Sequence, residues 1–176
     1  MRLAGDPLPD RAEMIRVDHA GEYGATRIYA GQLAVMGLRA PISAEVEHMA
    51  AQEDVHLAAF EKLLSARRVR PTLLMPLWKQ AGFALGAASA LAGPKVAMAV
   101  TAAVETEIDR HYQGQIDALQ DDDPELSGLI ARFQAEEVQH RESAIAHGAK
   151  EAPAYPLLSA LVRAGCRVAI RLSEKL

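Results

Sequence analysis

Hydrophobic residues recur along most of this chain at helical spacing, and prolines, glycines and short polar runs divide the pattern into six segments. Ser43 is the expected N-cap of the second segment, Pro94 the expected first residue of the fourth, and the acidic run ending at Asp123 the expected cap of the fifth. We predict helices over residues 11–38, 43–66, 73–90, 94–119 and 124–148, and from just after Pro156 to residue 176.

The order of these segments predicts an all-α fold within one domain spanning residues 1–176. The first two helices would form one hairpin and the fourth and fifth a second, which together make a four-helix bundle. The short third helix would cross between the hairpins, and the last would be an extra C-terminal helix. Half of the residues are hydrophobic but only 5% are aromatic, which suits closely packed helices better than a sheet.

A glutamate interrupts the apolar stripe of each of the four long bundle helices. Residues seven apart lie within about 20° of each other on a helix, and the row through Glu22 also contains Ile15, Tyr29 and Met36. The corresponding rows are Val46, Glu53, Phe60; Met98, Glu105, Tyr112, Leu119; and Ile130, Glu137, Ala144. Each carboxylate is therefore predicted to point into the bundle, where an unpaired charge is costly.

The same three-residue pattern occurs twice, as a lone glutamate followed on the next helix by Glu-x-x-His. The second glutamate follows the first after 31 positions in one copy and 32 in the other. Four-helix bundles hold pairs of iron or manganese ions with this arrangement. The predicted ligands are Glu22, Glu53, His56, Glu105, Glu137 and His140.

The spacing also assigns roles within a pair of metal ions. Glu53 and Glu137 would bridge the ions, each histidine would bind one of them, and Glu22 and Glu105 would be terminal ligands. Imidazole and carboxylate ligands suit ferrous iron, which can leave positions open for dioxygen, and manganese accepts the same set. We expect two iron ions per chain. The alternatives are charges on a solvated face, which the apolar rows oppose, and a buried network without metal, which repulsion among the carboxylates opposes.

Other polar residues fit this pattern less well. Glu45 and His48 repeat the Glu-x-x-His spacing, but their helix face is mixed and we predict that it is solvated. His19 and His147 are expected to be ordinary polar positions. Asp18, one turn before Glu22, is a candidate hydrogen-bond partner for the ligand histidines.

Charge and cysteine content exclude several classes of function. The net charge of −4, with no dominant basic patch, argues against nucleic acid as a partner. Cys166 is the single cysteine, so an internal disulfide and a cysteine-rich metal site are excluded. Residues 1–10 resemble neither a secretion signal nor a transit peptide, and we expect a cytoplasmic protein whose mature chain begins here.

Around the predicted ligands, the sequence strongly resembles the demethoxyubiquinone hydroxylase family of ubiquinone biosynthesis. The resemblance runs from Met14 to Leu176 without a departure at any of the six ligand positions. The segments that carry it are residues 15–25 (IRVDHAGEYGA), 27–32 (RIYAGQ), 70–78 (RPTLLMPLW), 82–86 (GFALG), 103–105 (AVE), 111–112 (HY) and 164–170 (AGCRVAI).

The resemblance implies a ferritin-like di-iron monooxygenase that hydroxylates the ring of a polyprenylated demethoxyubiquinol with O2. Electrons would come from the quinol, or from NADH through the bound quinone, although the chain contains no GxGxxG motif. By the same resemblance, His111 and Tyr112 would lie near the quinone. The alternative for Tyr112 is a core position with a satisfied hydroxyl. A lipid-binding accessory protein and a homo-oligomer are further implied partners.

A polyprenyl substrate also implies contact with a membrane. Residues 80–94 carry no charge but are too few to span a bilayer, and Arg163, Arg167 and Arg171 give the last helix a basic row. We expect a peripheral position on the cytoplasmic face of the inner membrane. The alternative is that both apolar stripes cover the core and the arginine row is solvated.

Two other functions use the same scaffold. One is iron storage or peroxide detoxification, and the other is a non-catalytic quinone-binding or assembly role. The complete ligand set opposes the second, because a site without metal would retain costly buried charges.

Overall fold

Six α-helices and one 3-10 helix make up the computed structural model of the protein, which describes residues 10–37 and 40–176. They are α1 (Arg11–Met36), α2 (Ser43–Ala66), α3 (Met75–Leu91), α4 (Pro94–Leu119), α5 (Pro124–Ala146), η1 (Ala149–Glu151) and α6 (Tyr155–Lys175). These described ranges contain no strand, so the all-α prediction is confirmed. The predicted end of the first helix at Leu38 and the expectation about the N-terminus fall outside the described residues, apart from Asp10.

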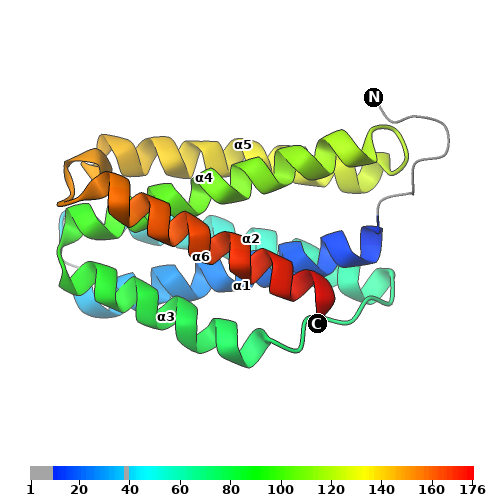
Figure 1. Ribbon diagram of the computed structural model, residues 1–176, viewed down its shortest axis with the longest axis horizontal. Coiled ribbons are helices and arrows are strands. Elements are labelled where there is room, and N and C mark those ends of the chain that lie inside the picture. Colours follow the sequence, from blue (N-terminus) through cyan, green and yellow to red (C-terminus); the bar gives the residue numbers. More distant parts are fainter. Residues whose placement is uncertain (1–9, 38–39) are drawn as a thin grey trace.

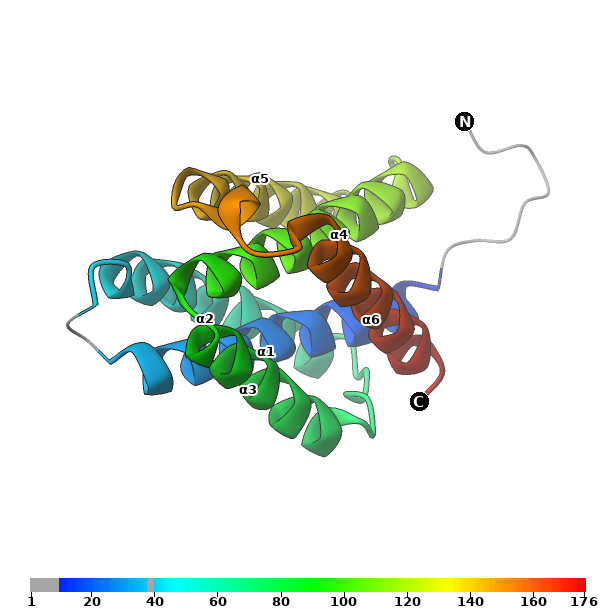
Figure 2. The same ribbon diagram turned by 60° about the vertical axis from the view of Figure 1, so that its left-hand side comes forward.

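The helices form the predicted bundle of two hairpins. α1 pairs with α2 and α4 pairs with α5, while α3 packs along α1 and α6 packs along α4 (Figures 1 and 2). α3 and α6 lie on the same side of the bundle in both views. α3 is the crossover between the hairpins and α6 is the extra C-terminal helix, as predicted. No described helix is both long and apolar enough to cross a bilayer.

Local sequence signals set most helix ends. Asp10 accepts hydrogen bonds from the first backbone N–H groups of α1, and Asp123 accepts one from Leu126 N at 3.1 Å, as expected of an N-cap. The prediction for Ser43 was wrong. It is the first helical residue, and its hydroxyl donates to the Gly37 carbonyl at the end of α1, so it closes the α1–α2 connection instead of capping α2.

A polar centre separates two apolar layers of the four-helix core, and a third apolar cluster joins α1 and α4 to α6. Each bundle helix contributes to one layer before its glutamate and to the other after it. In α1, for example, Ile15 lies in one layer and Tyr29 in the other. The glutamates therefore occupy one level of the bundle, enclosed by hydrophobic side chains on both sides.

Candidate metal centre

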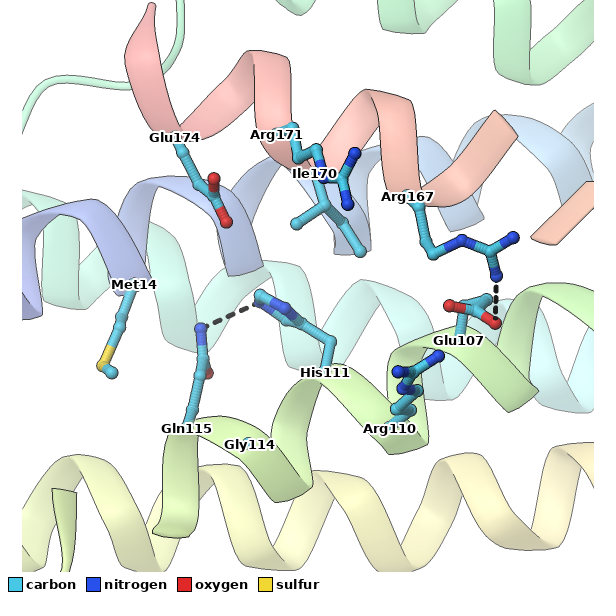
Figure 3. A pocket seen from close by; sticks show the side chains of 10 residues that line it. All are labelled: Met14, Glu107, Arg110, His111, Gly114, Gln115, Arg167, Ile170, Arg171 and Glu174. Carbon is cyan, nitrogen blue, oxygen red and sulfur yellow. Dashed lines mark hydrogen bonds and ion pairs between the residues drawn. The ribbon is translucent and has the colours of Figure 1, made fainter. Parts of the chain in front are cut away.

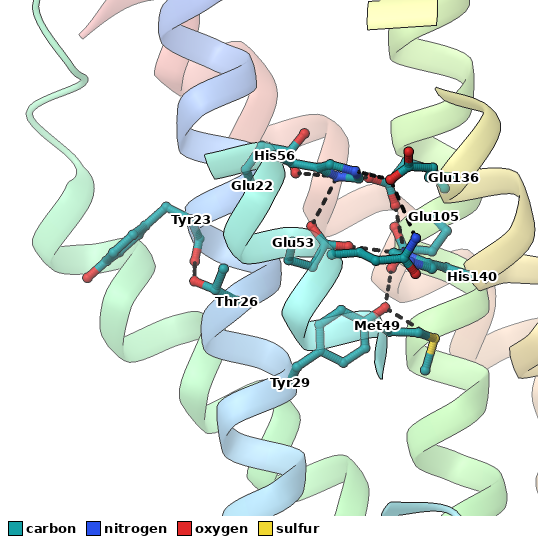
Figure 4. A network of polar contacts seen from close by, with 12 residues as sticks. Glu22, Tyr23, Thr26, Tyr29, Met49, Glu53, His56, Glu105, Glu136 and His140 are labelled. Atoms are coloured by element: carbon teal, nitrogen blue, oxygen red, sulfur yellow. Dashed lines mark hydrogen bonds and ion pairs between the residues drawn. The ribbon is translucent and has the colours of Figure 1, made fainter. Parts of the chain in front are cut away.

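The six predicted ligands converge at this level of the bundle. Their side chains form two groups in which the possible ligand atoms all lie within 4.8 Å of one another. Glu53 and Glu137 belong to both groups, as the prediction of bridging ligands requires. Figure 4 shows Glu53, His56 and His140 turned toward one another at this level. The groups are Glu22, Glu53, His56, Glu137 and Glu53, Glu105, Glu137, His140. All six residues are buried.

Both histidines turn the same ring nitrogen toward the carboxylates. His140 Nδ1 lies 3.1 Å from Glu53 Oε1 and 3.1 Å from Glu137 Oε2. His56 Nδ1 lies 3.0 Å from Glu137 Oε1 and 3.4 Å from Glu22 Oε2. Two Nδ1 atoms and four carboxylates thus face a common centre.

The opposite edges of the two rings have partners that the sequence analysis missed. His56 Nε2 lies 2.7 Å from Glu136 Oε2, and His140 Nε2 lies 3.0 Å from Gln52 Oε1. The expectation for Asp18 was wrong, because it is buried against α4 and accepts from Gln115 at 2.8 Å. A signal for the true partners did exist, since each directly precedes the glutamate of a Glu-x-x-His motif.

Two buried tyrosines donate to the carboxylates that were predicted to be terminal ligands. Tyr29 Oη donates to Glu105 Oε1 at 2.8 Å, and Tyr112 Oη donates to Glu22 Oε1. Tyr112 is buried and its hydroxyl has a hydrogen-bond partner, which fits the alternative that it is a core residue. The carboxylate that it contacts, Glu22, belongs to the centre. Its neighbour His111 contacts Asp18 at 3.2 Å and is not one of the clustered side chains.

The carboxylates of the centre are incompletely satisfied by the protein. Six buried polar atoms of the cluster lack a hydrogen-bond partner: Glu22 Oε2, both Glu53 oxygens, His56 Nδ1, Glu105 Oε2 and Glu137 Oε1. Unpaired buried polar atoms are unfavourable, and they are rare in native proteins unless an ion or water completes them. Oxygen and imidazole donors so close together match the ligand set of a divalent transition metal.

Burial and mutual repulsion shift the acid–base behaviour of the cluster. Burial raises the pKa of Glu53 and of Glu105 well above the ordinary value, and the charge of Glu137 adds to this effect. Burial also opposes ionisation of Glu137, but the nearby imidazoles of His140 and His56 lower its pKa to about 2. Burial opposes protonation of His56, yet contacts with Glu137 and Glu22 raise its pKa to about 11. Without cations, the centre therefore retains protons that metal ions would replace.

The residues set aside in the sequence analysis lie outside the centre. Glu45 accepts a hydrogen bond from the Ser143 hydroxyl, and His48 is exposed, as predicted for a solvated face. His147 is also exposed. His19 differs from expectation, because it is buried and desolvation lowers its pKa.

An apolar cavity of about 290 Å³ lies between α1, α3, α4 and α6. Two of its wall residues, Gly21 and Val104, directly precede the predicted ligands Glu22 and Glu105 in the chain. Other lining residues include Ile28, Trp78, Leu85, Ile108, Val162 and Cys166. The sequence analysis did not foresee this cavity, which is formed by residues from four separate helices.

A second, more polar cavity of about 360 Å³ opens between α4 and α6 (Figure 3). Its lining includes His111, Arg110, Arg171 and Glu174. The predicted basic row of α6 is partly neutralised here. Arg163 Nε and an Arg167 guanidinium nitrogen lie 2.6 and 2.8 Å from Oε1 of Glu107, which is buried on α4. Two of the three arginines therefore serve to attach α6 to α4.

Comparison with known proteins places this arrangement in a family. The profile of the family described as "Ubiquinone biosynthesis protein COQ7" matches residues 10–173. The chain belongs to this family. Among its COQ7 relatives is the 3-demethoxyubiquinol 3-hydroxylase of Rhodospirillum rubrum, 54% identical over 99% of this chain and 83% of the relative.

Relatives from eukaryotes show the same similarity. The human "NADPH-dependent 3-demethoxyubiquinone 3-hydroxylase, mitochondrial" is 53% identical over 93% of this chain and 76% of the relative. The Saccharomyces cerevisiae "5-demethoxyubiquinone hydroxylase, mitochondrial" is 40% identical over 93% of this chain and 77% of the relative. The resemblance expected from the sequence segments is confirmed over nearly the whole chain.

Proposed function

We propose that this protein is an oxidoreductase that hydroxylates the ring of demethoxyubiquinol in ubiquinone biosynthesis, with O2 as the oxygen source. One observation carries the proposal: the double Glu/His centre lies beside an apolar cavity, in a chain whose close relatives carry the name of this reaction.

The six clustered residues would hold two iron ions. Glu53 and Glu137 would contact both ions, His56 and Glu22 would complete one position, and His140 and Glu105 the other. When bound, ferrous iron supplies the reducing equivalents that activate dioxygen. Four carboxylates balance the four positive charges, which makes the loaded centre neutral within its two apolar layers.

The chain itself would bind and orient the substrate. The apolar cavity suits the quinol ring and the first part of a prenyl tail, because its walls are almost entirely hydrophobic. Gly21 and Val104 bring this wall close to the ligand-bearing turns of α1 and α4. Tyr112 would hold the Glu22 carboxylate in position, and the enclosing side chains would exclude water from the reacting ring.

The reductant in this proposal is a nicotinamide dinucleotide, NADH or NADPH, which reacts through the quinone. The name of the human relative specifies NADPH, and this chain has no dinucleotide-binding glycine motif. The polar cavity between α4 and α6 offers Arg110 and Arg171, neither of which contacts a carboxylate among the described residues. His111 lines the same cavity and directly precedes Tyr112, which donates to Glu22 of the centre.

We further propose that the protein binds the membrane surface through α3 and α6, on the cytoplasmic face of the inner membrane. Nine of the eleven large hydrophobic side chains that are exposed in the described chain lie on or next to these two helices. They are Leu73, Leu77, Phe83, Leu91, Leu157, Leu161, Val168, Leu172 and Leu176. Both helices border the apolar cavity, so a lipid substrate could enter from the bilayer. A lipid-binding accessory protein or a second copy of the chain could share this apolar surface.

An activity assay with matched histidine variants tests the proposal. Protein loaded with ferrous iron should convert a short-chain demethoxyubiquinol into a product one oxygen atom heavier. His56→Ala should lose at least 100-fold of this activity, because one metal position loses its nitrogen ligand. His48→Ala, in the other Glu-x-x-His of α2, should retain it. Equal activity of the two variants, or no product from the loaded protein, would refute the assignment.

A further inference from the structure

We propose that Gln52 and Glu136 are positioning residues that hold the two ligand histidines from opposite hairpins and make the two metal positions chemically unlike. This inference rests on the proposed metal centre and concerns how the protein controls it. Neither residue is among the six ligands, and each precedes a ligand glutamate in the sequence.

The hydrogen bonds of this pair cross between the hairpins. Gln52 on α2 contacts His140 on α5, and Glu136 on α5 contacts His56 on α2. Because a residue and its successor point about 100° apart on a helix, the ligand glutamate can face the centre while its predecessor reaches sideways to the opposite helix. Each Glu-x-x-His helix therefore orients the histidine of the other.

The four side chains form one continuous chain of hydrogen bonds. Glu136 Oε2 lies 2.7 Å from His56 Nε2 and 3.5 Å from the Gln52 amide nitrogen. The Gln52 amide oxygen then accepts from His140 Nε2 at 3.0 Å. Glu136 and the Gln52 amide oxygen are both acceptors, so Nε2 of each histidine ring carries the proton. Each Nδ1 is then available to a metal ion.

The same chain introduces an asymmetry into a nearly symmetric centre. Each metal position has one histidine, one terminal glutamate and a tyrosine that donates to that glutamate. Only the outer partners differ in charge, since His56 donates to a carboxylate and His140 to an amide. A charged acceptor makes the stronger hydrogen bond and increases electron donation from the imidazole to its metal. The ion bound by His56 should therefore be the more tightly held.

The donor–acceptor order also explains why one partner is Gln and the other Glu. Two glutamates here would place like charges where the 3.5 Å contact now lies, without a proton donor between them. In the double exchange Gln52→Glu/Glu136→Gln, the pair again has one amide donor and one carboxylate. The carboxylate would then contact His140 and the amide would contact His56. This exchange provides a direct test.

The test combines metal titration with Mössbauer spectroscopy of the protein loaded anaerobically with ⁵⁷Fe²⁺. We expect two distinct ferrous signals in the wild type. Glu136→Gln should make the signals more alike and weaken the tighter site about tenfold or more. Gln52→Glu should weaken binding, and the double exchange Gln52→Glu/Glu136→Gln should recover two distinct signals. Glu142→Gln removes an exposed charge from the same helix and should change nothing.

The outcomes separate this inference from the proposed function. Unchanged spectra and affinities in Glu136→Gln, or a double exchange no better than Gln52→Glu, would overturn the positioning role. Indistinguishable signals in the wild type would overturn the asymmetry. If the wild type binds no iron, both the metal centre and this inference fail. Circular dichroism and thermal unfolding of each metal-free variant confirm that the bundle is intact.

Discussion

At the scale of single residues, the two halves of the centre repeat the same construction. Tyr29 lies one heptad after Glu22 and donates to Glu105, whereas Tyr112 lies one heptad after Glu105 and donates to Glu22. Glu22 and Glu105 are therefore each held by a tyrosine from the opposite hairpin. This reciprocal bonding ties α1 to α4 at the level of the centre, where apolar packing is interrupted.

The stability of the metal-free protein should depend on pH because of the buried carboxylates. Burial raises the pKa of Glu53 well above its unfolded value near 4.5. The folded protein therefore holds a proton on Glu53 that the unfolded chain releases above about pH 4.5. This proton stabilises the fold fully below pH 4.5, and the stabilisation is lost as the pH rises toward the folded-state pKa. The pKa values of Glu22 and Glu105 are raised as well, and that of His56 to about 11, so all three act in the same direction.

Glu53→Gln should consequently unfold at a higher temperature than the wild type at neutral pH without metal, and show a weaker decline as the pH increases. Ferrous iron should reverse the order, because the amide supplies a poorer ligand. Thermal unfolding under anaerobic conditions, with and without iron, measures both effects. A range of about pH 5 to 8 is suitable because it lies above the unfolded pKa of roughly 4.5. A wild type that is more stable than the variant without metal would contradict this account.

Sequence reasoning was most successful at this scale for residues defined by one helix. The convergence of the six candidate ligands could be predicted because each occupies an apolar heptad row, a property of its own helix. Gln52 and Glu136 were missed because their function depends on how far the opposite helix is rotated. Asp18 was misassigned for the same reason: it has suitable chemistry but faces Gln115 and His111.

At the scale of elements, glycines determine how closely α3 approaches α1. A Cβ atom on Gly86 would lie 1.9 Å from the Ile28 carbonyl oxygen and 2.8 Å from its carbonyl carbon. A Cβ atom on Gly31 of α1 would likewise lie 2.2 Å from the Phe83 carbonyl oxygen. The two backbones are therefore in direct contact. This packing places α3 over α1, where it forms one wall of the apolar cavity.

Gly86→Ala should therefore separate α3 from α1 and lower the free energy of unfolding by about 1 to 3 kcal/mol, the usual cost of overpacking. Gly128→Ala is the matched control, because nothing lies within 4 Å of a Cβ there and the position is in a helix. That substitution should be neutral or stabilising by up to about 1 kcal/mol. Denaturant unfolding measures both free energies of unfolding. Equal stability of the two variants would show that the contact at Gly86 does not determine how closely α3 packs on α1.

Helix positions were largely predictable, whereas their contacts were not. Proline and aspartate signals gave the starts of α4 and α5 because capping is local. Ser43 was misassigned because its hydroxyl donates to the carbonyl of Gly37, six residues earlier and outside its own helix. The arginine row of α6 looked solvated or membrane-facing until the structure placed Glu107 against it, since nothing within α6 signals that partner.

At the scale of the whole molecule, the centre, the apolar cavity and the exposed hydrophobic side chains follow one another outward through the bundle. α3 and α6 line the cavity with their inner faces and expose large hydrophobic residues on their outer faces. Both helices lie on the same side of the bundle (Figure 2). This arrangement would let a lipid substrate move from a bilayer to the centre without crossing water.

Membrane binding should therefore depend on α6 and not on α2. Leu157 and Leu161 are each 63% exposed on α6, and Val55 is 64% exposed on α2. Leu157→Asp/Leu161→Asp should reduce co-sedimentation with phospholipid vesicles at least tenfold, because two apolar contacts with the lipid are replaced by charges. Val55→Asp should bind like the wild type. Unchanged sedimentation of the α6 variant would exclude this surface as the membrane contact.

The measurement that tests the central claim most directly is a single turnover under ¹⁸O₂. The protein is loaded anaerobically with ferrous iron, given a short-chain demethoxyubiquinol, and exposed to the labelled gas, and the quinone product is then weighed. We predict one ¹⁸O atom on the ring, and its loss in Glu137→Ala, which removes a side chain that belongs to both candidate metal-binding groups. Iron oxidation with an unlabelled ring would identify an oxidase or an iron store and contradict the hydroxylase assignment.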